Sequence, residues 1–273
     1  MRLYLEFLRY ATTLCTKMQA FSLFLCALSQ MCGFAFSIRL FPFGIKCVTL
    51  LWGDEMYKYE THLHTFPVSR CAKASVRESL EYYKKLGYDG VFITNHFLDG
   101  NINFDKTKPY EEKIEFYFSD YEAALDIGKE LGIKVFLGVE LSEYGTDFLV
   151  YGLDKQWFLQ HPEIMEMERS AELQFMMDSG ALVIQAHPFR GRHPIRLFHR
   201  WVHGVEVFNC HDLDSSDLAQ QYCRHYGLIE FAGSDNHRGP GQPELAGIQC
   251  VQPITSVEDF IDKIKNGQAE IFY

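Results

Sequence analysis

The stretch Thr61-His62-Leu63-His64-Thr65 is the part of the sequence that best indicates both the fold and the site. It follows a short run, residues 57–60, that we interpret as a β-strand. Side chains two positions apart on a strand point to the same side. His62 and His64 would therefore direct two imidazoles at one point, as two ligands of one metal ion do. The pair alone is weak evidence, because two histidines on a surface strand are common.

Later parts of the chain strengthen this interpretation, because four further apolar runs each end in residues that can bind metal. These residues are His96, Glu140, His187, and the pair Asp235 and His237. Strands that alternate with helices along the chain predict a parallel sheet. With about seven strands and no glycine-rich phosphate-binding fingerprint, a barrel is favoured over an open sheet. The carboxyl ends of barrel strands meet at one mouth, so we expect these residues to meet there.

The composition sets outer limits on the class of protein. The chain has 273 residues, of which 47% are hydrophobic and 23% charged, so it can bury a sizeable core as one large domain or two small ones. A net charge of -10 disfavours a partner such as a long nucleic acid, which needs a basic face. It does not disfavour a small anionic substrate that metal ions hold.

The cysteines indicate a reducing environment. The chain has 8 of them and no CxxC pair, which excludes a zinc ribbon or a thioredoxin-like motif. Four lie in the first fifty residues, and the others are scattered, as reduced thiols usually are. We therefore expect a cytoplasmic protein.

Residues 1–55 differ in kind from residues 56–273, and we predict a domain boundary between them. No charged residue occurs between Lys17 and Arg39, which fits a signal peptide or a membrane anchor. The alternative, which we favour, is a misassigned start codon. Met56 immediately precedes the first clear strand, and the codons for residues 52–55 would form a purine-rich tract like a ribosome-binding site. Membrane contact is expected only if the segment is a true anchor.

Two capping boxes predict where helices begin. Ser75 has Glu78 three residues later, and Ser119 has Glu122 in the same relation. We interpret residues 101–118, which lack a clear period, as a loop or a short helix.

Five short motifs, taken together, resemble the PHP (polymerase and histidinol phosphatase) family over essentially all of residues 56–273. The motifs are Thr61-His62-Leu63-His64-Thr65, Ile93-Thr94-Asn95-His96, Gly138-Val139-Glu140, Ala186-His187-Pro188 and Gly233-Ser234-Asp235-Asn236-His237. Each is weak alone, but they occur in the family's order. The resemblance implies an α/β fold, a distorted seven-stranded (β/α) TIM-like barrel with two or three divalent metal ions at the C-terminal mouth. It also implies hydrolysis of phosphate esters.

The resemblance also implies a set of ligands. The first metal would be held by His62, His64, Glu140 and Asp235. Glu140 would bridge to a second metal that His187 also binds, and His96 and His237 would hold a third. Mixed imidazole and carboxylate ligands suit zinc, manganese or iron better than calcium.

Three positions depart from the family's pattern. Asn95 stands where the family usually has an aspartate, which removes a carboxylate near the site. Cys71 is the nearest candidate for a further ligand of the third metal, and it either ligates as a thiolate or merely packs. Asp147 lies on the strand that often supplies a histidine to the second metal, so it either substitutes for that histidine or the ligand is absent.

The segment 187–203 carries four arginines and no acidic residue in an otherwise acidic chain. We predict that Arg190 and Arg192 bind the substrate's phosphate, because guanidinium groups match phosphate bidentately. Arg196 and Arg200, four positions apart, have the simpler interpretation of facing solvent, and the whole segment is alternatively a basic surface loop.

These patterns predict a metal-dependent phosphoesterase that acts on a small phosphorylated molecule. A metal-bound hydroxide would attack phosphorus, and His96, His237 or an arginine would stabilise the leaving oxygen. No catalytic side chain beyond the metal-bound water is predicted. Two alternatives stay open: a nuclease or nucleotide phosphatase on the same metals, and a non-catalytic metal-binding regulatory barrel.

Overall fold

A computed structural model describes residues 35–38, 48–51, 56–143, 145–191 and 195–273. The chain divides into two compact units, Met1–Glu55 and Met56–Tyr273. In the first unit β1 (Ala35–Ile38) pairs antiparallel with β2 (Val48–Leu51). Most of residues 1–55 lies outside the described residues, so the anchor and start-codon interpretations stay predictions. Within the described part of the chain, no helix is long and apolar enough to cross a membrane.

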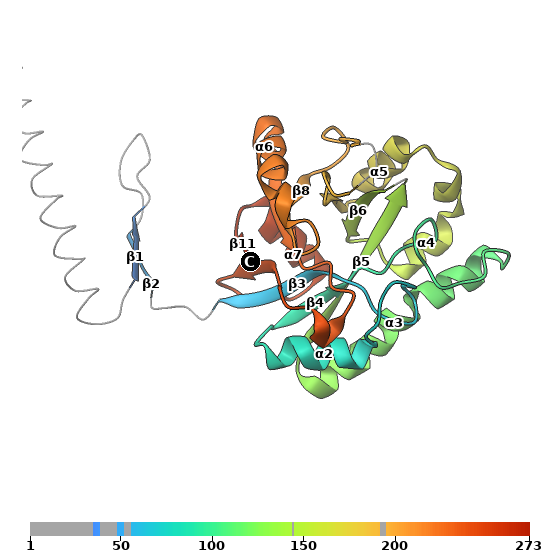
Figure 1. The fold of residues 1–273 in the computed structure, drawn as a ribbon, viewed down its shortest axis with the longest axis horizontal. Coiled ribbons are helices and arrows are strands. Elements are labelled where there is room, and N and C mark those ends of the chain that lie inside the picture. The colour runs from blue at the N-terminus through green and yellow to red at the C-terminus, as the bar shows by residue number, and fades with distance from the viewer. Residues whose placement is uncertain (1–34, 39–47, 52–55, 144, 192–194) are drawn as a thin grey trace, which may run out of the picture. The chain divides into compact units, whose positions relative to one another are not determined.

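The second unit is built on one large sheet, whose strands are ordered as they follow in the chain from β3 to β9. These strands are β3 (Tyr57–Leu63), β4 (Gly90–Ile93), β5 (Lys134–Glu143), β6 (Thr146–Tyr151), β7 (Leu182–Ala186), β8 (Gly204–Asn209) and β9 (Ile229–Gly233). Two more strands, β10 (Gly247–Cys250) and β11 (Ala269–Phe272), extend the sheet antiparallel beyond β3. The sheet curls into a nearly closed barrel with helices outside it (Figure 1). The predicted fold class is confirmed.

One strand, β6, runs against its neighbours. It pairs antiparallel with both β5 and β7, whereas the other neighbouring pairs from β3 to β9 are parallel. Only residues 144–145 separate β5 from β6, and a parallel connection needs a dozen residues or more. The first residues of β6 therefore lie at the mouth where other strands end. This reversal brings Asp147 to that mouth.

The barrel closes where β3 meets the end of β9. The His64 N–H donates to the Asn236 carbonyl at 3.0 Å, and the Asn236 N–H donates to the His62 carbonyl at 3.1 Å. Gly233 permits this approach, because a Cβ added there would lie 2.5 Å from the Cβ of His62. We call these contacts between residues 60–64 and 233–236 the β3–β9 seam.

A buried carboxylate completes the β3–β9 seam. Glu60 Oε1 accepts the backbone N–H groups of Thr61 at 2.9 Å, His62 at 2.8 Å and Ser234 at 3.0 Å. Its Oε2 accepts the hydroxyl of Tyr83 at 2.6 Å. Glu60 is fully buried, and burial raises its pKa even though these hydrogen bonds oppose the rise. One side chain thus satisfies backbone groups on both sides of the seam.

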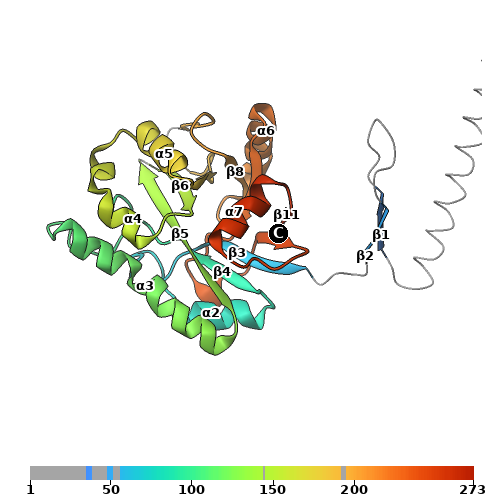
Figure 2. The same ribbon diagram turned by 180° about the vertical axis from the view of Figure 1, so that it is seen from behind.

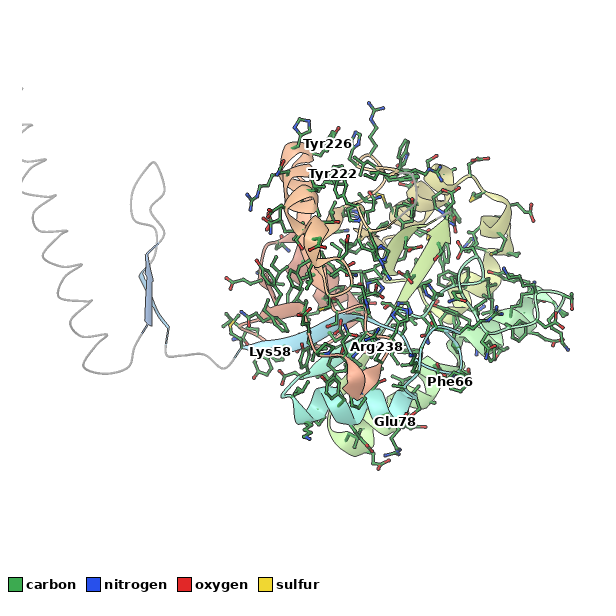
Figure 3. The ribbon with its side chains drawn as sticks, viewed as in Figure 1. Lys58, Phe66, Glu78, Tyr222, Tyr226 and Arg238 are labelled. Atoms are coloured by element: carbon green, nitrogen blue, oxygen red, sulfur yellow. The ribbon has the colours of Figure 1, made fainter. Side chains whose placement is uncertain are left out.

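Helices cover the outside of the sheet. They are α2 (Val76–Lys85), α3 (Tyr110–Leu131), α4 (Lys155–Gln160), α5 (Arg169–Asp178), α6 (Ser216–Tyr226) and α7 (Val257–Lys265), with short 3-10 turns η1 (Pro162–Glu166), η2 (Leu213–Ser215) and η3 (Gly239–Gly241). α2 contacts β4, α3 contacts β5, α5 contacts β7 and α6 contacts β8 (Figures 1 and 2). The capping box of Ser75 and Glu78 is present at the start of α2, where Figure 3 labels Glu78.

The second predicted capping box is wrong. Helix α3 begins at Tyr110, so Ser119 lies inside it and donates its hydroxyl back to the carbonyl of Phe116 at 2.7 Å. Much of the stretch 101–118 is therefore helical. Ile114 and Phe118, four positions apart, are both buried on one face of the helix. This packing stabilises the helix upstream of Ser119, so the helix does not begin at the predicted cap.

The interior of the barrel is aromatic at the end away from the mouth. Phe92 on β4 and Tyr151 on β6 both contact Phe260 of α7, with ring centroids 4.3 and 5.1 Å apart. Tyr151 is the last residue of the reversed strand β6, so α7 covers the end of the barrel opposite the mouth. Aromatic side chains therefore pack together at the end of the barrel opposite the mouth.

We predict that Glu60→Ala destabilises the protein by more than about 3 kcal/mol, since each buried donor that loses its acceptor costs about 1–3 kcal/mol. Chemical denaturation with a chelator present measures this change without a contribution from bound metal. Glu81→Ala, at an exposed position of α2, is the control and should have little effect. Equal stability of the two variants would show that the β3–β9 seam does not depend on Glu60.

Candidate metal centre

The predicted ligands meet at the mouth of the barrel. A cavity of about 450 Å³ is lined by Cys71, His96, Asn101, Glu140, Gly145, Asp147, His187, Arg190, Gly191, Asp235 and His237. His62 and His64 are fully buried and contact Glu140 and Asp235. Of the residues predicted for the site, only Arg192 lies outside the described residues.

The first donor group consists of His62, His64, Glu140 and Asp235. The two Nε2 atoms of the histidines lie 3.1 Å apart. His62 Nε2 is 3.1 Å from Glu140 Oε1 and 3.4 Å from Asp235 Oδ1, and His64 Nε2 is 3.2 Å from the same aspartate oxygen. Ligands bound to a tetrahedral ion at about 2.0–2.2 Å are roughly 3.3–3.6 Å apart. The donor atoms of His62, His64 and Asp235 all lie within 4.8 Å of one another, nearly as the ligands of one ion do, and Glu140 contacts both histidines beside them.

The outer nitrogen of His62 fixes which ring atom carries the proton. Its Nδ1 lies 3.0 Å from Glu206 Oε1, and a carboxylate only accepts hydrogen bonds. Nδ1 is therefore protonated, and Nε2 directs its lone pair at the first donor group. Glu206 also accepts the backbone N–H of His187 at 3.1 Å. This glutamate thus orients two predicted ligands.

A longer relay gives His64 the same polarity. Ser69 Oγ accepts the His96 backbone N–H at 3.1 Å and donates its proton to Asn95 Oδ1 at 2.8 Å. The amide orientation of Asn95 is fixed, because its Oδ1 also accepts the Thr65 N–H at 2.7 Å. Ser69 Oγ therefore has only a lone pair left for His64 Nδ1, 3.2 Å away. His64 Nδ1 must donate, and its Nε2 faces the centre unprotonated.

The carboxylate missing at Asn95 comes from another element. Asp120 of α3 accepts the Thr65 hydroxyl at 2.7 Å and lies 3.3 Å from Asn95 Nδ2. A buried carboxylate is therefore present beside this position, supplied by a helix instead of the strand end. The sequence did not reveal it, because the contact depends on how α3 packs against the segment that follows β3.

This polarity leaves lone pairs and carboxylate oxygens facing one another in a buried space, which a cation would stabilise. The charges agree. Despite burial, Asp235 and Glu206 raise the pKa of His62 well above its usual range, so these carboxylates favour a positive charge at Nε2, which a second proton or a metal ion would supply. Burial opposes ionisation of Glu140, yet neighbouring histidines hold its pKa well below the usual range. The first donor group therefore fits a bound divalent metal.

The second donor group consists of Glu140, Asp147 and His187. His187 Nε2 is 3.6 Å from Glu140 Oε1 and 3.5 Å from Asp147 Oδ2. Asp147 thus lies where it can substitute for the histidine that the family often supplies to the second metal. Glu140 is common to this group and the first, as a bridging ligand is.

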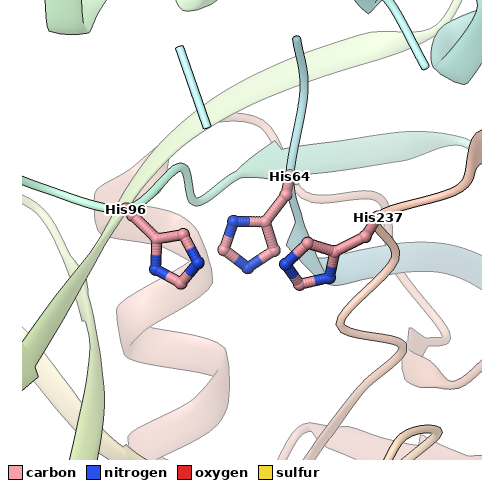
Figure 4. A group of neighbouring side chains, drawn as sticks. All are labelled: His64, His96 and His237. Carbon is pink, nitrogen blue, oxygen red and sulfur yellow. The ribbon is translucent and has the colours of Figure 1, made fainter. Parts of the chain in front are cut away.

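The third donor group combines His64, His96 and His237, which lie side by side although they come from three separate segments (Figure 4). His96 Nδ1 lies 2.6 Å from Glu140 Oε2. Among the described residues neither atom has a hydrogen-bond partner of acceptable geometry, although both are buried. Despite burial, Glu140 raises the pKa of His96 well above its usual range, as an ion pair between the two side chains would.

Cys71 lies against this third group. Its sulfur lines the same cavity as His96 and His237. Burial raises the pKa of the thiol, but the neighbouring imidazoles of His237 and His96 outweigh it and lower the pKa to about 6. A thiol with this pKa is available as a thiolate, the form that binds metal.

Two of the predicted ligands have strained backbones. His187 has φ 26° and Asp235 has φ 52°, the left-handed region that side chains other than glycine rarely adopt. Such strain costs on the order of 1–3 kcal/mol per residue and is typical of functional sites. The surrounding hydrogen bonds hold both residues in the positions from which they face the centre.

His211 is a site residue that the sequence analysis missed. It lies with Asp235 and His237 in a further group of potential ligands. Its Nε2 is buried and has no hydrogen-bond partner within the part of the chain that the structure describes. It follows the end of β8 by two residues, so the rule that strand ends carry the site would have found it.

Of the arginines in the segment 187–203, Arg190 lies at the cavity and Arg196 lies outside it. Arg190 lines the cavity, forms an ion pair with Asp235 and is about one-third exposed, 36%. Arg196 is exposed and pairs with Glu143 at 2.7 Å, as expected for a residue outside the site.

No protein-family model matches this chain, and a search of curated proteins finds no relative. Solved structures do match. A two-domain protein from Bacteroides vulgatus ATCC 8482, containing a predicted PHP-like metal-dependent phosphoesterase, matches with a TM-score of 0.61 and 15% sequence identity, over 82% of this chain and 66% of that chain. PsfC from Pseudomonas syringae PB-5123 matches with a TM-score of 0.53 and 16% identity, over 80% of this chain and 91% of that chain.

At such low identities the likeness concerns the fold. It confirms the barrel that the resemblance to the PHP family implied. This chain spans just under two thirds of the two-domain protein, so the activity of that whole protein does not transfer to it.

We predict that Ser69→Ala lowers the affinity for divalent metal about 10–100-fold, the usual loss when a group that orients a ligand is removed. The reason is that Ser69 fixes the tautomer of His64. Competition with a chromophoric chelator measures the affinity. Ser79→Ala is the matched control, because Ser79 is also fully buried but its hydroxyl makes no hydrogen bond among the described residues. Unchanged affinity in Ser69→Ala, or an equal loss in the control, would contradict the relay.

Proposed function

We propose that this chain is a metal-dependent hydrolase that cleaves a phosphate ester of a small phosphorylated molecule. The observation that supports it most is the sharing of Glu140. Its carboxylate contacts His62, His96 and His187, which belong to three adjoining donor groups around one cavity. Adjoining ions held in this way are typical of enzymes that displace groups at phosphorus.

The chemistry of the donors fits divalent transition metals. Imidazole and carboxylate ligands suit zinc, manganese and iron, and the three groups offer room for two or three ions. Bound ions would supply an activated water and positive charge to the phosphoryl group. The chain's own residues then have to hold the substrate in line with that centre.

Arg190 is the residue best placed to bind the substrate. Its guanidinium contacts Asp235 and lines the same cavity, so it lies beside the first donor group. A guanidinium has five N–H donors, and its ion pair with Asp235 leaves others for phosphoryl oxygens. The positive charge would stabilise the developing charge in the transition state.

A small substrate is favoured over a long nucleic acid. The cavity of about 450 Å³ lies within the range of pockets that hold small molecules. The net charge of -10 opposes association with a polyanion. The free cysteines, including Cys71 at the centre, fit a reducing, cytoplasmic location.

Glu140→Gln should lose both bound metal and phosphoesterase activity, because one neutral amide replaces the carboxylate that faces all three donor groups. Elemental analysis after reconstitution with manganese, iron and zinc gives the metal content, and a panel of small phosphate esters gives the activity. Removing metal from the wild-type protein with a chelator should abolish activity, and adding it back should restore it. Metal that stays bound with no hydrolysis of any ester would instead support the regulatory barrel.

Arg190→Ala should keep its metal, since Arg190 competes with metal for the Asp235 carboxylate. Its kcat/KM for phosphate esters should fall about 10²–10³-fold, the usual cost of losing one charged contact to a transition state. Arg196→Ala, in the same arginine-rich segment but paired with Glu143, is the control and should keep full activity. A panel that includes an oligonucleotide separates the small-molecule phosphoesterase from a nuclease. Full activity in Arg190→Ala would exclude Arg190 from the site.

A further inference from the structure

The first residue of α5, Arg169, is a buried cation with partners in three segments of the chain. Its Nη2 donates to Asp99 Oδ2 at 2.5 Å and to the Ser142 carbonyl at 3.1 Å. Its Nη1 donates to Glu172 Oε2 at 2.7 Å. The planar guanidinium thus joins α5 to the segment after β4 and to the hairpin that β5 and β6 form. In both Figure 1 and Figure 2, α5 lies beside β6.

Ser142, the hairpin residue that the guanidinium binds, lies between two predicted ligands. It follows Glu140 by two positions and pairs across the hairpin with Asp147. Its N–H donates to Asp99 Oδ1 at 3.3 Å, so its N–H and its carbonyl are both held by the same network. Asp99 in turn follows His96 by three positions. The contact therefore links the strand ends that carry His96, Glu140 and Asp147.

Close packing around Ser142 makes this link stiff. A Cβ added at Gly100 would lie 3.0 Å from Ser142 Oγ and 3.0 Å from the Cβ of His96. On the other side, the guanidinium carbon of Arg169 lies 6.0 Å from the ring centroid of Phe148, which is fully buried. Closely packed groups transmit displacements to one another. A shift of the guanidinium would therefore move the hairpin relative to the segment after β4.

The charges of this network balance only with a proton. One guanidinium faces the carboxylates of Asp99 and Glu172, and the Glu172 side chain is 6% exposed. Burial raises the pKa of Glu172 to about 8, Asp99 and Glu143 add to the rise, and Arg169 opposes it. Burial and nearby carboxylates, Glu172 among them, also raise the pKa of Tyr110 on α3. Below a pH of about 8, Glu172 is therefore neutral and the guanidinium charge is left to Asp99.

We propose that Arg169 is a positioning residue that holds the hairpin of β5 and β6 against the segment after β4. Through Ser142 it sets the spacing between His96, Glu140 and Asp147. Arg169 is not among the described residues that line the cavity, so it acts without touching a bound ion or substrate. The proposal rests on the proposed function only in treating that cavity as a metal centre.

Arg169→Lys tests this role, because lysine keeps the charge but loses the planar fork that reaches several acceptors. On the full chain, competition between Mn²⁺ and a chromophoric chelator should show one ion bound at least about tenfold more weakly, with the tightest ion unchanged. The weakened ion should be that of the second donor group, which takes Glu140 and Asp147 from the hairpin. Arg77→Lys makes the same change in an exposed two-bond pair with Glu130 and should leave every affinity unchanged.

A second variant keeps the test decisive if Arg169→Lys folds poorly, which chemical denaturation with a chelator present would reveal. Asp99→Asn retains an acceptor for the Ser142 N–H but removes the charge that pairs with Arg169. It should therefore show the same selective loss of one ion. Wild-type affinity for every ion in the folded variants, or an equal weakening of all ions, would overturn the proposal.

A pH series separates positioning from a merely structural role. Glu172→Gln mimics the neutral carboxyl, so this variant and the wild type should bind Mn²⁺ equally at about pH 7. Above a pH of about 8, Glu172 of the wild type ionises and competes with the Ser142 carbonyl for the guanidinium. The Mn²⁺ affinity of the second donor group should then fall below that of Glu172→Gln. Protonation of the metal ligands cancels in the ratio of the two affinities, and a ratio that stays constant to about pH 9 would contradict the proposal.

Hydrolysis of small phosphate esters by the same proteins reports on the proposed function alone. An active phosphoesterase whose Arg169→Lys variant binds every ion as the wild type does refutes only the positioning role. Selective loss of one ion, with no hydrolysis of any ester by the wild type, supports the positioning role and refutes the phosphoesterase. A wild-type protein that binds no metal refutes both.

Discussion

The carboxylate of Glu60 is the interaction on which the site depends. It accepts backbone N–H groups of β3 and the N–H of Ser234, the residue that follows β9. Ser234 lies 174 positions after Glu60 in the chain. His62 and Asp235 lie next to these anchored positions, so their side chains are brought within 3.4 Å. A barrel that did not close here would separate the two halves of the first donor group. This fully buried carboxylate thus positions the metal centre without being one of its donor groups.

Much of the site could be predicted from the sequence, because the relevant geometry is local or general. The spacing of His62 and His64 is a property of any strand, and the convergence of His96, Glu140, His187 and Asp235 is a property of any parallel barrel. The reversed strand β6 is an instructive case. The sequence predicted a parallel sheet and not the reversal, because the two-residue turn that requires a hairpin is evident only once the structure shows that β5 continues to Glu143.

What could not be predicted depends on packing between distant elements. The start of α3 is set by buried aromatic and aliphatic contacts, which overrode the cap at Ser119. The contribution of Asp120 depends on how α3 lies against the loop after β3. The tautomer of His64 depends on a chain of hydrogen bonds through Ser69 and Asn95 that no spacing along the sequence reveals.

The shared position of Glu140 has a consequence for how such a centre tolerates change. Glu140 contacts a histidine in each of three donor groups, so a substitution there would disturb all three groups at once. Asp147, in contrast, belongs to only one group of potential ligands among the described residues. We therefore expect the centre to tolerate a substitution of Asp147 better than a substitution of Glu140. In evolution or in protein engineering, the ligands of the second donor group could therefore change while the barrel and the first donor group stay intact.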